Sequence, residues 1–319
     1  MTESIEQEAL ASGLGTDAEV SLLDQIMEQT KIDKGDESYA VANEGMQAFL
    51  SELLKMDKPE RARKQLVDEM IASIDEKIGL QLDEVLHNEQ FQKMESAWRG
   101  LQFMVDRTDF KQNNKIEMLN VSKADLLEDF DDATDITESG LYKHVYTAEF
   151  GTHGGEPISN MIANYEFDHS SPDISLMRSC ASVAAMAHAP FIAAAGAKFF
   201  GIEDIQELPK LNDISATFEG PQYAKWQSLR ESEDARYLAL TMPKFLLRLP
   251  YDSIENPVKS FNYNESINED HNRYCWGNTS FAMATRLTDS FSKFRWCPNI
   301  IGPQSGGQNK LVGVRLLAN

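Results

Sequence analysis

The chain has 319 residues, of which 42% are hydrophobic and 25% are charged, and this is the composition of a folded globular protein. Lys and Arg number 30 against 51 Asp and Glu, so the net charge of −21 repels phosphate backbones and anionic lipid surfaces. We therefore expect no nucleic acid among the partners of this protein.

Residues 1–38 are predicted to form an acidic N-terminal arm. The first 60 residues contain 14 acidic and 4 basic side chains, which is about half of the net negative charge. A capping box of Thr16 and Glu19 begins a short amphipathic helix in this arm. Its apolar residues are Val20, Leu23, Ile26 and Met27. A helix of this length is marginal alone in water, so we expect it to dock either on its own domain or on another protein.

Residues 39–110 are predicted to be mostly helical. Apolar side chains recur at helical spacing in residues 39–54, and Pro59 opens a second helix of the same kind. The strongest periodicity lies in residues 87–105, where apolar residues at steps of three and four predict a helix with one buried stripe. The stripe consists of Phe91, Met94, Trp98, Leu101 and Val105.

Gly100 and Arg99 lead to two further predictions about this helix. Gly100 costs a helix roughly 1 kcal/mol relative to Ala, so we expect another segment to approach the backbone closely at that turn. Arg99 points away from the stripe, where it is placed to reach a carboxylate.

Beyond residue 110 the pattern alternates between short strands and helices. Strands are predicted at residues 116–121, 161–167, 191–195 and 237–242. Helices are predicted after a cap of Ser122 and Asp125, at residues 141–146, after Pro172, around Trp226 and at residues 276–294. Residues 128–135 are predicted to be an acidic surface loop, and residues 151–157 a glycine-rich turn. The alternation predicts an α+β fold of mixed helices and strands rather than a bundle or a sandwich.

Several of these segments resemble one protein family. Residues 87–101 contain His-x-x-x-Phe followed by Glu-x-x-Trp-Arg-Gly-Leu, which looks like the signature helix of the large subunit of the type VI secretion contractile sheath, the TssC or VipB family. Further blocks resemble that family at residues 149–157, 164–168, 187–191, 225–230, 243–251 and 276–278. The resemblance is carried by Phe91, Trp98, Arg99, Gly100, Leu101, Gly154, Gly155, Trp226, Arg248 and Trp276.

The resemblance implies a contractile-sheath subunit, similar to a phage tail sheath protein, with a partial mixed α/β sheath domain in residues 111–307. In this family the large subunit pairs with a small sheath subunit, TssB or VipA. These heterodimers stack on one another around the Hcp tube, from a baseplate, and contraction ejects the tube. A ClpV-type AAA+ ATPase engages the N-terminal helix of the large subunit. That resemblance makes candidate contacts of Leu22, Leu23, Ile26 and Met27.

Residues 308–319 depart from the family pattern. The family continues past a Gly-Gly pair like Gly306 and Gly307 into a long C-terminal portion, whereas this chain reads QNKLVGVRLLAN. This difference suggests a fragment or a frameshift, and hence a truncated sheath protein that does not assemble. The resemblance implies that the missing portion supplies strands that interlock neighbouring subunits.

The residues alone leave a cytoplasmic metal-dependent hydrolase as an alternative. His87, Asn88 and Glu89 resemble the start of a zinc deaminase signature, but no Pro-Cys-x-x-Cys follows to complete it. The 6 histidines offer no His-x-x-x-His spacing, and the glycine-rich turn lacks the Lys-Ser or Lys-Thr of a P-loop. We therefore predict no catalytic residue, cofactor or metal site, and a hydrolase requires that distant ligands meet in the fold.

The sequence also indicates a cytoplasmic location. No apolar run approaches the roughly 20 residues needed to span a bilayer, and the N-terminus is acidic where a signal peptide is basic. We therefore expect no membrane insertion. Cys180, Cys275 and Cys297 are odd in number and widely spaced, which indicates reduced thiols.

Overall fold

The computed structural model describes residues 37–54, 60–268, 270–308 and 310–315. The chain divides into two compact units, Met1–Ile78 and Gly79–Asn319. The amphipathic helix predicted in the acidic arm lies outside the described residues. Within the described residues, no helix is long and apolar enough to cross a membrane.

In the first unit the structure describes α2 (Glu37–Leu54) and most of α3 (Glu60–Leu86), whose last turns belong to the second unit. Both helices were predicted from apolar spacing and are confirmed. In α3, Ile71 and Ile74 lie about one turn apart and are each 49% exposed. The first unit therefore presents apolar side chains on its surface.

The second unit is built around a three-stranded parallel sheet with the strand order β1-β2-β3. Its strands are β1 (Met161–Phe167), β2 (Phe191–Ala195) and β3 (Leu238–Thr241). Phe191 in the central strand pairs with Met161 on one side and with Leu238 on the other. The three predicted strands at these positions are confirmed. Since β2 is covered on both faces, its sequence is a continuous apolar run.

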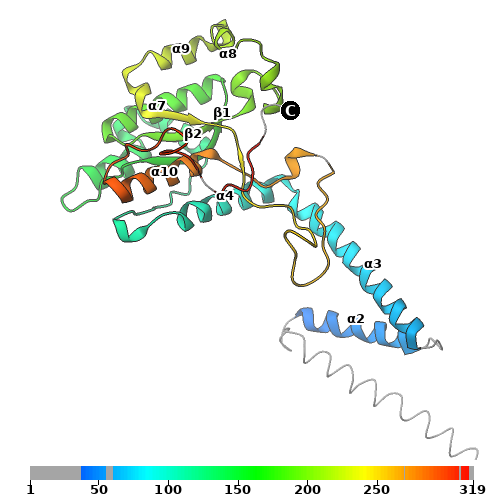
Figure 1. Cartoon of the computed structure of the whole chain (residues 1–319). Helices are drawn as coiled ribbons and strands as arrows, with labels where there is room; N and C mark the ends of the chain where they lie inside the picture. Colours follow the sequence, from blue (N-terminus) through cyan, green and yellow to red (C-terminus); the bar gives the residue numbers. More distant parts are fainter. Residues whose placement is uncertain (1–36, 55–59, 269, 309, 316–319) are drawn as a thin grey trace, which may run out of the picture. The chain divides into compact units, whose positions relative to one another are not determined.

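A long helix covers each face of this sheet (Figure 1). The connection from β1 to β2 is α7 (Ser171–Ala187), whose fully buried Ala181 and Ala184 allow close approach to the sheet and its neighbours. The other face is crossed by α10 (Thr279–Phe294), which contacts all three strands and α4. Its Phe281 packs with Ile162 of β1 in a separate apolar cluster. The sheet therefore has an apolar core on both sides.

Further helices surround this core. The other α-helices of the second unit are α4 (Glu89–Asp106), α5 (Lys123–Asp132), α6 (Gly140–Tyr142), α8 (Ile214–Thr217) and α9 (Ala224–Arg230). A π-helix, η3 (Lys143–Phe150), continues directly from α6. Short 3-10 helices are η1 (Phe110–Gln112), η2 (Ile136–Glu138), η4 (Ala197–Phe200), η5 (Ile205–Lys210), η6 (Pro221–Tyr223), η7 (Glu233–Tyr237) and η8 (His271–Arg273). The predicted helices near residues 141–146 and around Trp226 are confirmed as α6 with η3 and as α9.

A small antiparallel sheet pairs β4 (Phe245–Leu246) with β5 (Trp276–Gly277), and the C-terminal segment adds to it. The backbone N–H of Leu246 donates to the carbonyl of Gly313 at 2.8 Å, and that of Arg315 donates to the carbonyl of Lys244 at 2.9 Å. Residues 310–315, within the segment predicted to depart from the family pattern, thus pack against the small sheet.

The strand predicted at residues 116–121 is absent, because this segment is largely exposed and forms no ladder with β1. Met118 and Leu119 are 64% and 50% exposed, and the segment contacts β1 through the hydroxyl of Tyr165, which donates to the carbonyl of Val121 at 2.6 Å. The hydroxyl of Ser280 donates to the carbonyl of Ala163 at 3.0 Å, and the amide of Asn278 donates to the carbonyl of Tyr165 at 3.1 Å. Both side chains come from the start of α10 and hold this helix against β1.

The acidic residues 128–135 are not a loop throughout, as was predicted. The capping box of Ser122 and Asp125 is confirmed, and α5 continues from it to Asp132. Asp129 then accepts a hydrogen bond from the backbone N–H of Gly140 at 2.9 Å. Its carboxylate stabilises the N-terminus of α6, which explains why helix continues into this acidic stretch.

The largest correction concerns the predicted core stripe of α4. Gly100 and Met104 are the buried residues of this helix, and a Cβ added to Gly100 would lie 2.5 Å from the ring of Phe281. The close approach predicted at Gly100 is therefore confirmed. Trp98, however, is 60% exposed and Met94 is 51% exposed, so the prediction that this stripe is core is wrong. Because α10 meets α4 at Gly100, the bulkier side chains are turned away from it.

Candidate functional site

A buried charge cluster joins α4 to the loops beside it. Glu95 of α4 accepts hydrogen bonds from Nε of Arg248 and from Nε of Arg99, each at 2.7 Å. Glu265 accepts from Nη1 of Arg248 at 2.6 Å and lies 3.3 Å from Nε2 of His87. Arg248 and Glu265 are only 8% and 9% exposed. The expectation that Arg99 reaches a carboxylate is confirmed.

Glu95 and Arg248 each favour the charged form of the other. Burial by itself raises the pKa of Glu95, but the hydrogen bonds and charges of Arg248 and Arg99 outweigh burial and keep this pKa below its ordinary value. Burial likewise lowers the pKa of Arg248, and Glu265 and Glu95 outweigh it and raise this pKa above its ordinary value. The cluster is therefore suited to fixing α4 against the segment after β4 rather than to exchanging protons in a reaction.

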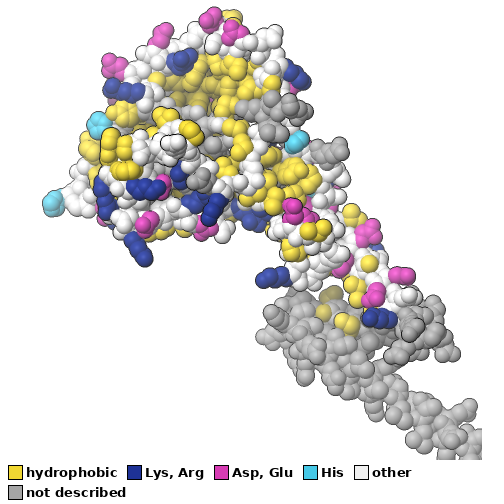
Figure 2. All heavy atoms as spheres, viewed as in Figure 1, with side chains coloured by type: hydrophobic (Ala, Val, Ile, Leu, Met, Phe, Trp, Pro, Cys, Tyr) yellow, Lys and Arg dark blue, Asp and Glu magenta, His cyan; other side chains and the backbone are white. Residues whose placement is uncertain are grey.

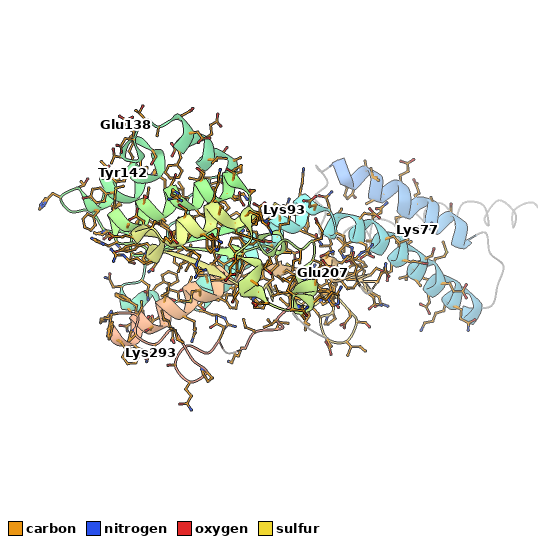
Figure 3. The ribbon with its side chains drawn as sticks, turned by 90° about the horizontal axis from the view of Figure 1, so that it is seen from above. Lys77, Lys93, Glu138, Tyr142, Glu207 and Lys293 are labelled. Carbon is orange, nitrogen blue, oxygen red and sulfur yellow. The ribbon has the colours of Figure 1, made fainter. Side chains whose placement is uncertain are left out.

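The outer face of α4 forms an exposed apolar groove of about 530 Å³. Its lining residues are Leu86, Phe91, Met94, Glu95, Trp98, Arg99, Gln102 and Tyr251. Lys93, labelled in Figure 3, lies on the same helix outside this lining and pairs with Glu89 at 2.6 Å. Exposed large apolar side chains at helical spacing are typical of a surface that binds a helix of another protein. We call this surface the α4 groove.

The other signature residues lie apart from the α4 groove. Gly154 has a φ of 82°, and a Cβ added to Gly155 would lie 2.1 Å from the carbonyl oxygen of Glu149, so the predicted glycine turn is confirmed. Trp226 packs edge-on against Phe199 with 4.9 Å between ring centroids.

The small sheet holds the remaining signature tryptophan. Nε1 of Trp276 donates to the carbonyl of His271 at 2.6 Å. The guanidinium of Arg315 lies 5.6 Å from the centroid of the Trp276 ring. A residue of the C-terminal segment thus covers a residue of the family signature.

The structure brings only some of the predicted site residues together. Arg99 and Arg248 meet through Glu95, while Phe91 and Trp98 share the α4 groove and Leu101 packs towards α10. The candidate ATPase contacts lie outside the described residues; they are Leu22, Leu23, Ile26 and Met27.

Glu265 is the member of the charge cluster that the sequence did not reveal. It lies 17 residues from Arg248 in an irregular segment, so no helical or strand period indicates its burial. A lone acidic residue in a polar segment carries no signal of a buried partner, and only the folded chain identifies it.

The titratable side chains show no metal chemistry. His87 faces Glu265, and no group of three or more His, Cys, Asp and Glu side chains in the described part of the chain is placed to hold a metal ion. The three cysteines are free thiols, as predicted. Burial raises the pKa of Cys180 to about 12 and that of Cys275 to about 12, so both are protonated and unreactive at neutral pH.

Comparison with known proteins supports the resemblance found in the sequence. Residues 68–317 match the sequence model of the family described as VipB (EvpB/VC_A0108, tail sheath N-terminal domain). The type VI secretion system sheath protein TssC1 of Pseudomonas aeruginosa PAO1 is 41% identical over 246 residues, which are 76% of this chain and 49% of TssC1. The chain thus spans about half the length of this curated relative. The family match continues past Gly307 to residue 317 and so includes most of the predicted non-family tail.

Proposed function

Because the chain belongs to the VipB tail sheath family of type VI secretion systems, we propose that it acts as a sheath subunit that pairs with the small sheath subunit, TssB or VipA. The family consists of structural sheath proteins and not of enzymes, which argues against the hydrolase alternative. The paired subunits stack helically in the cytoplasm, from a baseplate and around the Hcp tube. Contraction of this sheath drives ejection of the tube.

The observation that carries the proposed pairing is the exposure of the family signature on α4. Trp98 and Met94 are large apolar side chains that the described chain leaves more than half exposed. Exposure of such side chains to water is unfavourable in free energy, and a partner surface that covers them removes this cost. A helix of the small sheath subunit, with its own apolar stripe, fits the α4 groove.

Co-expression of the tagged chain with its cognate small sheath subunit tests this pairing. We expect the two proteins to copurify in equal amounts, and we expect the double variant Met94→Asp with Trp98→Asp to lose the small subunit because it places charge in the groove. Ile254→Asp is the matched control, since Ile254 is apolar, 88% exposed and outside the groove. Pairing that survives the double variant contradicts the proposed surface, and a wild-type chain that does not copurify contradicts the pairing itself.

Negative-stain microscopy of the copurified proteins tests sheath assembly. Tubules are the outcome that the proposed function predicts. Stable pairs without tubules favour the second candidate, a sheath subunit that pairs but does not assemble into a tube.

We further propose that the N-terminal arm binds a ClpV-type AAA+ ATPase. The support is the amphipathic spacing of the arm and its resemblance to the family's N-terminal helix. Replacing Leu23 and Ile26 with Asp should abolish capture of the ATPase, while the circular dichroism spectrum of the chain stays unchanged. Undiminished capture would remove these residues from the proposed contact.

A further inference from the structure

The α4 groove is built from three segments that are separate in the sequence. Leu86 is the last residue of α3, Phe91 and Trp98 belong to α4, and Tyr251 comes from the irregular segment that follows β4. Leu86 and Tyr251 line the groove only while the end of α3 and the irregular segment are held against α4. The shape of the groove therefore depends on contacts made outside α4.

Residues 251–265 form a closed loop, which we call the strap. The backbone N–H of Glu265 donates to the carbonyl of Tyr251 at 2.8 Å, and the backbone N–H of Tyr251 donates to the carboxylate of Glu265 at 3.0 Å. Within the loop, the Asp252 carboxylate accepts hydrogen bonds from the backbone N–H groups of the residues two and three positions later. Loops of this length whose ends meet are compact units and are frequently functional. The strap is thus a preformed unit that fastens neighbouring elements as a whole.

Tyr263 fastens the strap to the last turns of α3. Its hydroxyl donates to Oδ1 of Asp83 at 2.6 Å, and the backbone N–H of Ser266, just past the strap, donates to the same oxygen at 3.3 Å. The ring lies against Gly79, one turn earlier in α3, where an added Cβ would be 3.4 Å away. Tyr263 is only 2% exposed. We call the pair of Tyr263 and Asp83 the latch.

The strap also meets α4 (Figure 1, where the strap is drawn in gold to orange). Nη2 of Arg99 donates to the hydroxyl of Tyr251 at 3.3 Å, and the guanidinium of Arg248 lies 4.5 Å from the centroid of the Tyr251 ring. In the same view, Figure 2 shows hydrophobic side chains at the surface of this region. Tyr251 is therefore placed in the α4 groove by contacts with α4 and by the strap to which it belongs.

The latch is a hydrogen bond between a buried donor and a carboxylate. Burial raises the pKa of Tyr263 above its ordinary value, and the hydrogen bond and charge of Asp83 raise it further, so the hydroxyl stays protonated and continues to donate. Hydrogen bonds to a charged acceptor are about twice as strong as those between neutral groups. Phenylalanine at this position keeps the ring and removes the bond, so the latch can be released without emptying its packing site.

We propose that Tyr263 and Asp83 are positioning residues of the α4 groove. Neither belongs to the lining of the groove, so they act through the strap. While the latch is closed, Leu86 and Tyr251 stay in place as walls of the groove. When it is released, the strap separates from α3, and a bound helix loses its contacts at these walls. The last step rests on the proposed pairing with the small sheath subunit, whereas the hold of the latch on the strap does not.

Hydrogen exchange on the chain alone tests that hold. In Tyr263→Phe, we expect the amides of residues 79–87 and 251–266 to exchange at least about tenfold faster than in the wild type. The amides of α7 should not change, because the loss is local. Tyr237→Phe is the matched control, since it removes a hydroxyl that lies 3.1 Å from Nδ1 of His188, away from the strap. Unchanged exchange in both ranges overturns the proposal, and so does an equal acceleration in α7.

A double-variant cycle tests whether the two residues act through one bond. Asp83→Ala should also accelerate exchange in residues 251–266, and adding Tyr263→Phe to it should accelerate exchange less than about twofold further. Glu84→Ala changes the next acidic residue, which is exposed, and should have no effect on the strap. Effects of the two single variants that multiply in the double variant overturn the latch.

Capture of the cognate small sheath subunit tests the consequence for the α4 groove. We expect Tyr263→Phe to reduce the captured subunit at least about fivefold, and Tyr237→Phe to leave it unchanged. Undiminished capture by Tyr263→Phe overturns the proposal. A wild-type chain that captures nothing contradicts the proposed pairing instead, and the exchange measurement then decides whether the latch holds the strap.

Discussion

The two faces of α4 differ in the size of their side chains and in whether these side chains are buried. The inner face packs through Ser96, Gly100 and Met104, with the Ser96 hydroxyl donating to the carbonyl of Trp276 at 2.6 Å. The outer face carries Met94 and Trp98, which are the larger side chains and are mostly exposed. Close packing between helices is favoured by small side chains, so the bulkiest apolar residues of a helix need not mark its buried face.

The largest expected effect comes from breaking the buried charge cluster, whose Glu95 and Arg99 border the α4 groove. Arg248→Met leaves Glu265 and Glu95 buried without their main partner, so we expect a loss of about 3 to 5 kcal/mol in the free energy of unfolding. Urea denaturation measures this loss. Lys93→Met is the control, because it breaks an exposed pair with Glu89 and should leave the midpoint unchanged. Equal midpoints for both variants would contradict the assigned role of Arg248.

Gly100→Ala tests the contact between α4 and α10 on the inner face of α4. The added Cβ clashes with the ring of Phe281, and this overpacking exceeds the gain in helix propensity, so we expect a net loss of about 1 to 2 kcal/mol. Gly45→Ala is the matched control, since a Cβ there meets nothing within 4 Å. That substitution should stabilise α2 by about 1 kcal/mol. A Gly100→Ala variant as stable as the wild type would mean that the helices do not meet at this residue.

The pH dependence of stability tests the charge of Glu95. Its pKa is lowered in the folded chain, so its contribution is complete above the unfolded pKa of about 4.3 and is lost as the pH falls through the folded pKa. We expect the wild type to lose more free energy of unfolding than Glu95→Gln on acidification from about pH 6 to about pH 3. Urea denaturation at each pH gives the two slopes, and identical slopes would show that Glu95 does not contribute through its charge.

The smallest expected effect belongs to the outer face. Trp98→Ala in the chain alone should lower the free energy of unfolding by less than about 1 kcal/mol, because the side chain is 60% exposed. Replacing a buried tryptophan with alanine lowers the free energy of unfolding by about 3 to 5 kcal/mol. Urea denaturation therefore distinguishes an exposed Trp98 from a buried one. A loss of about 3 kcal/mol or more would show that Trp98 is buried in the core.

Local patterns predicted the elements of the sheet and its helices well. The apolar runs of β1 and β2, the cap of α5 at Ser122 and the turn at Gly154 follow from propensities that act over a few residues. The prediction of a strand at residues 116–121 was wrong for a nonlocal reason, because a strand also needs a partner strand, and this largely exposed segment has none in the described part of the chain.

The candidate surfaces were predicted less completely than the elements. The signature residues of α4 were recognised, but the spacing of Phe91, Met94 and Trp98 is the same whether this stripe faces a core or a partner. The position of β3 at one end of the sheet was not predicted, since strand order is not contained in the sequence of any one strand.

The sequence by itself determined the family, the α+β class and the close approach at Gly100, because these depend on motifs, periodicity and the cost of a glycine in a helix. Only the tertiary structure decided which face of α4 is buried, that Glu265 pairs with Arg248, and in which order the strands of the sheet pair. Each of these depends on segments that are distant in sequence and meet only in the folded chain, where packing and paired charges select among arrangements that are locally equivalent.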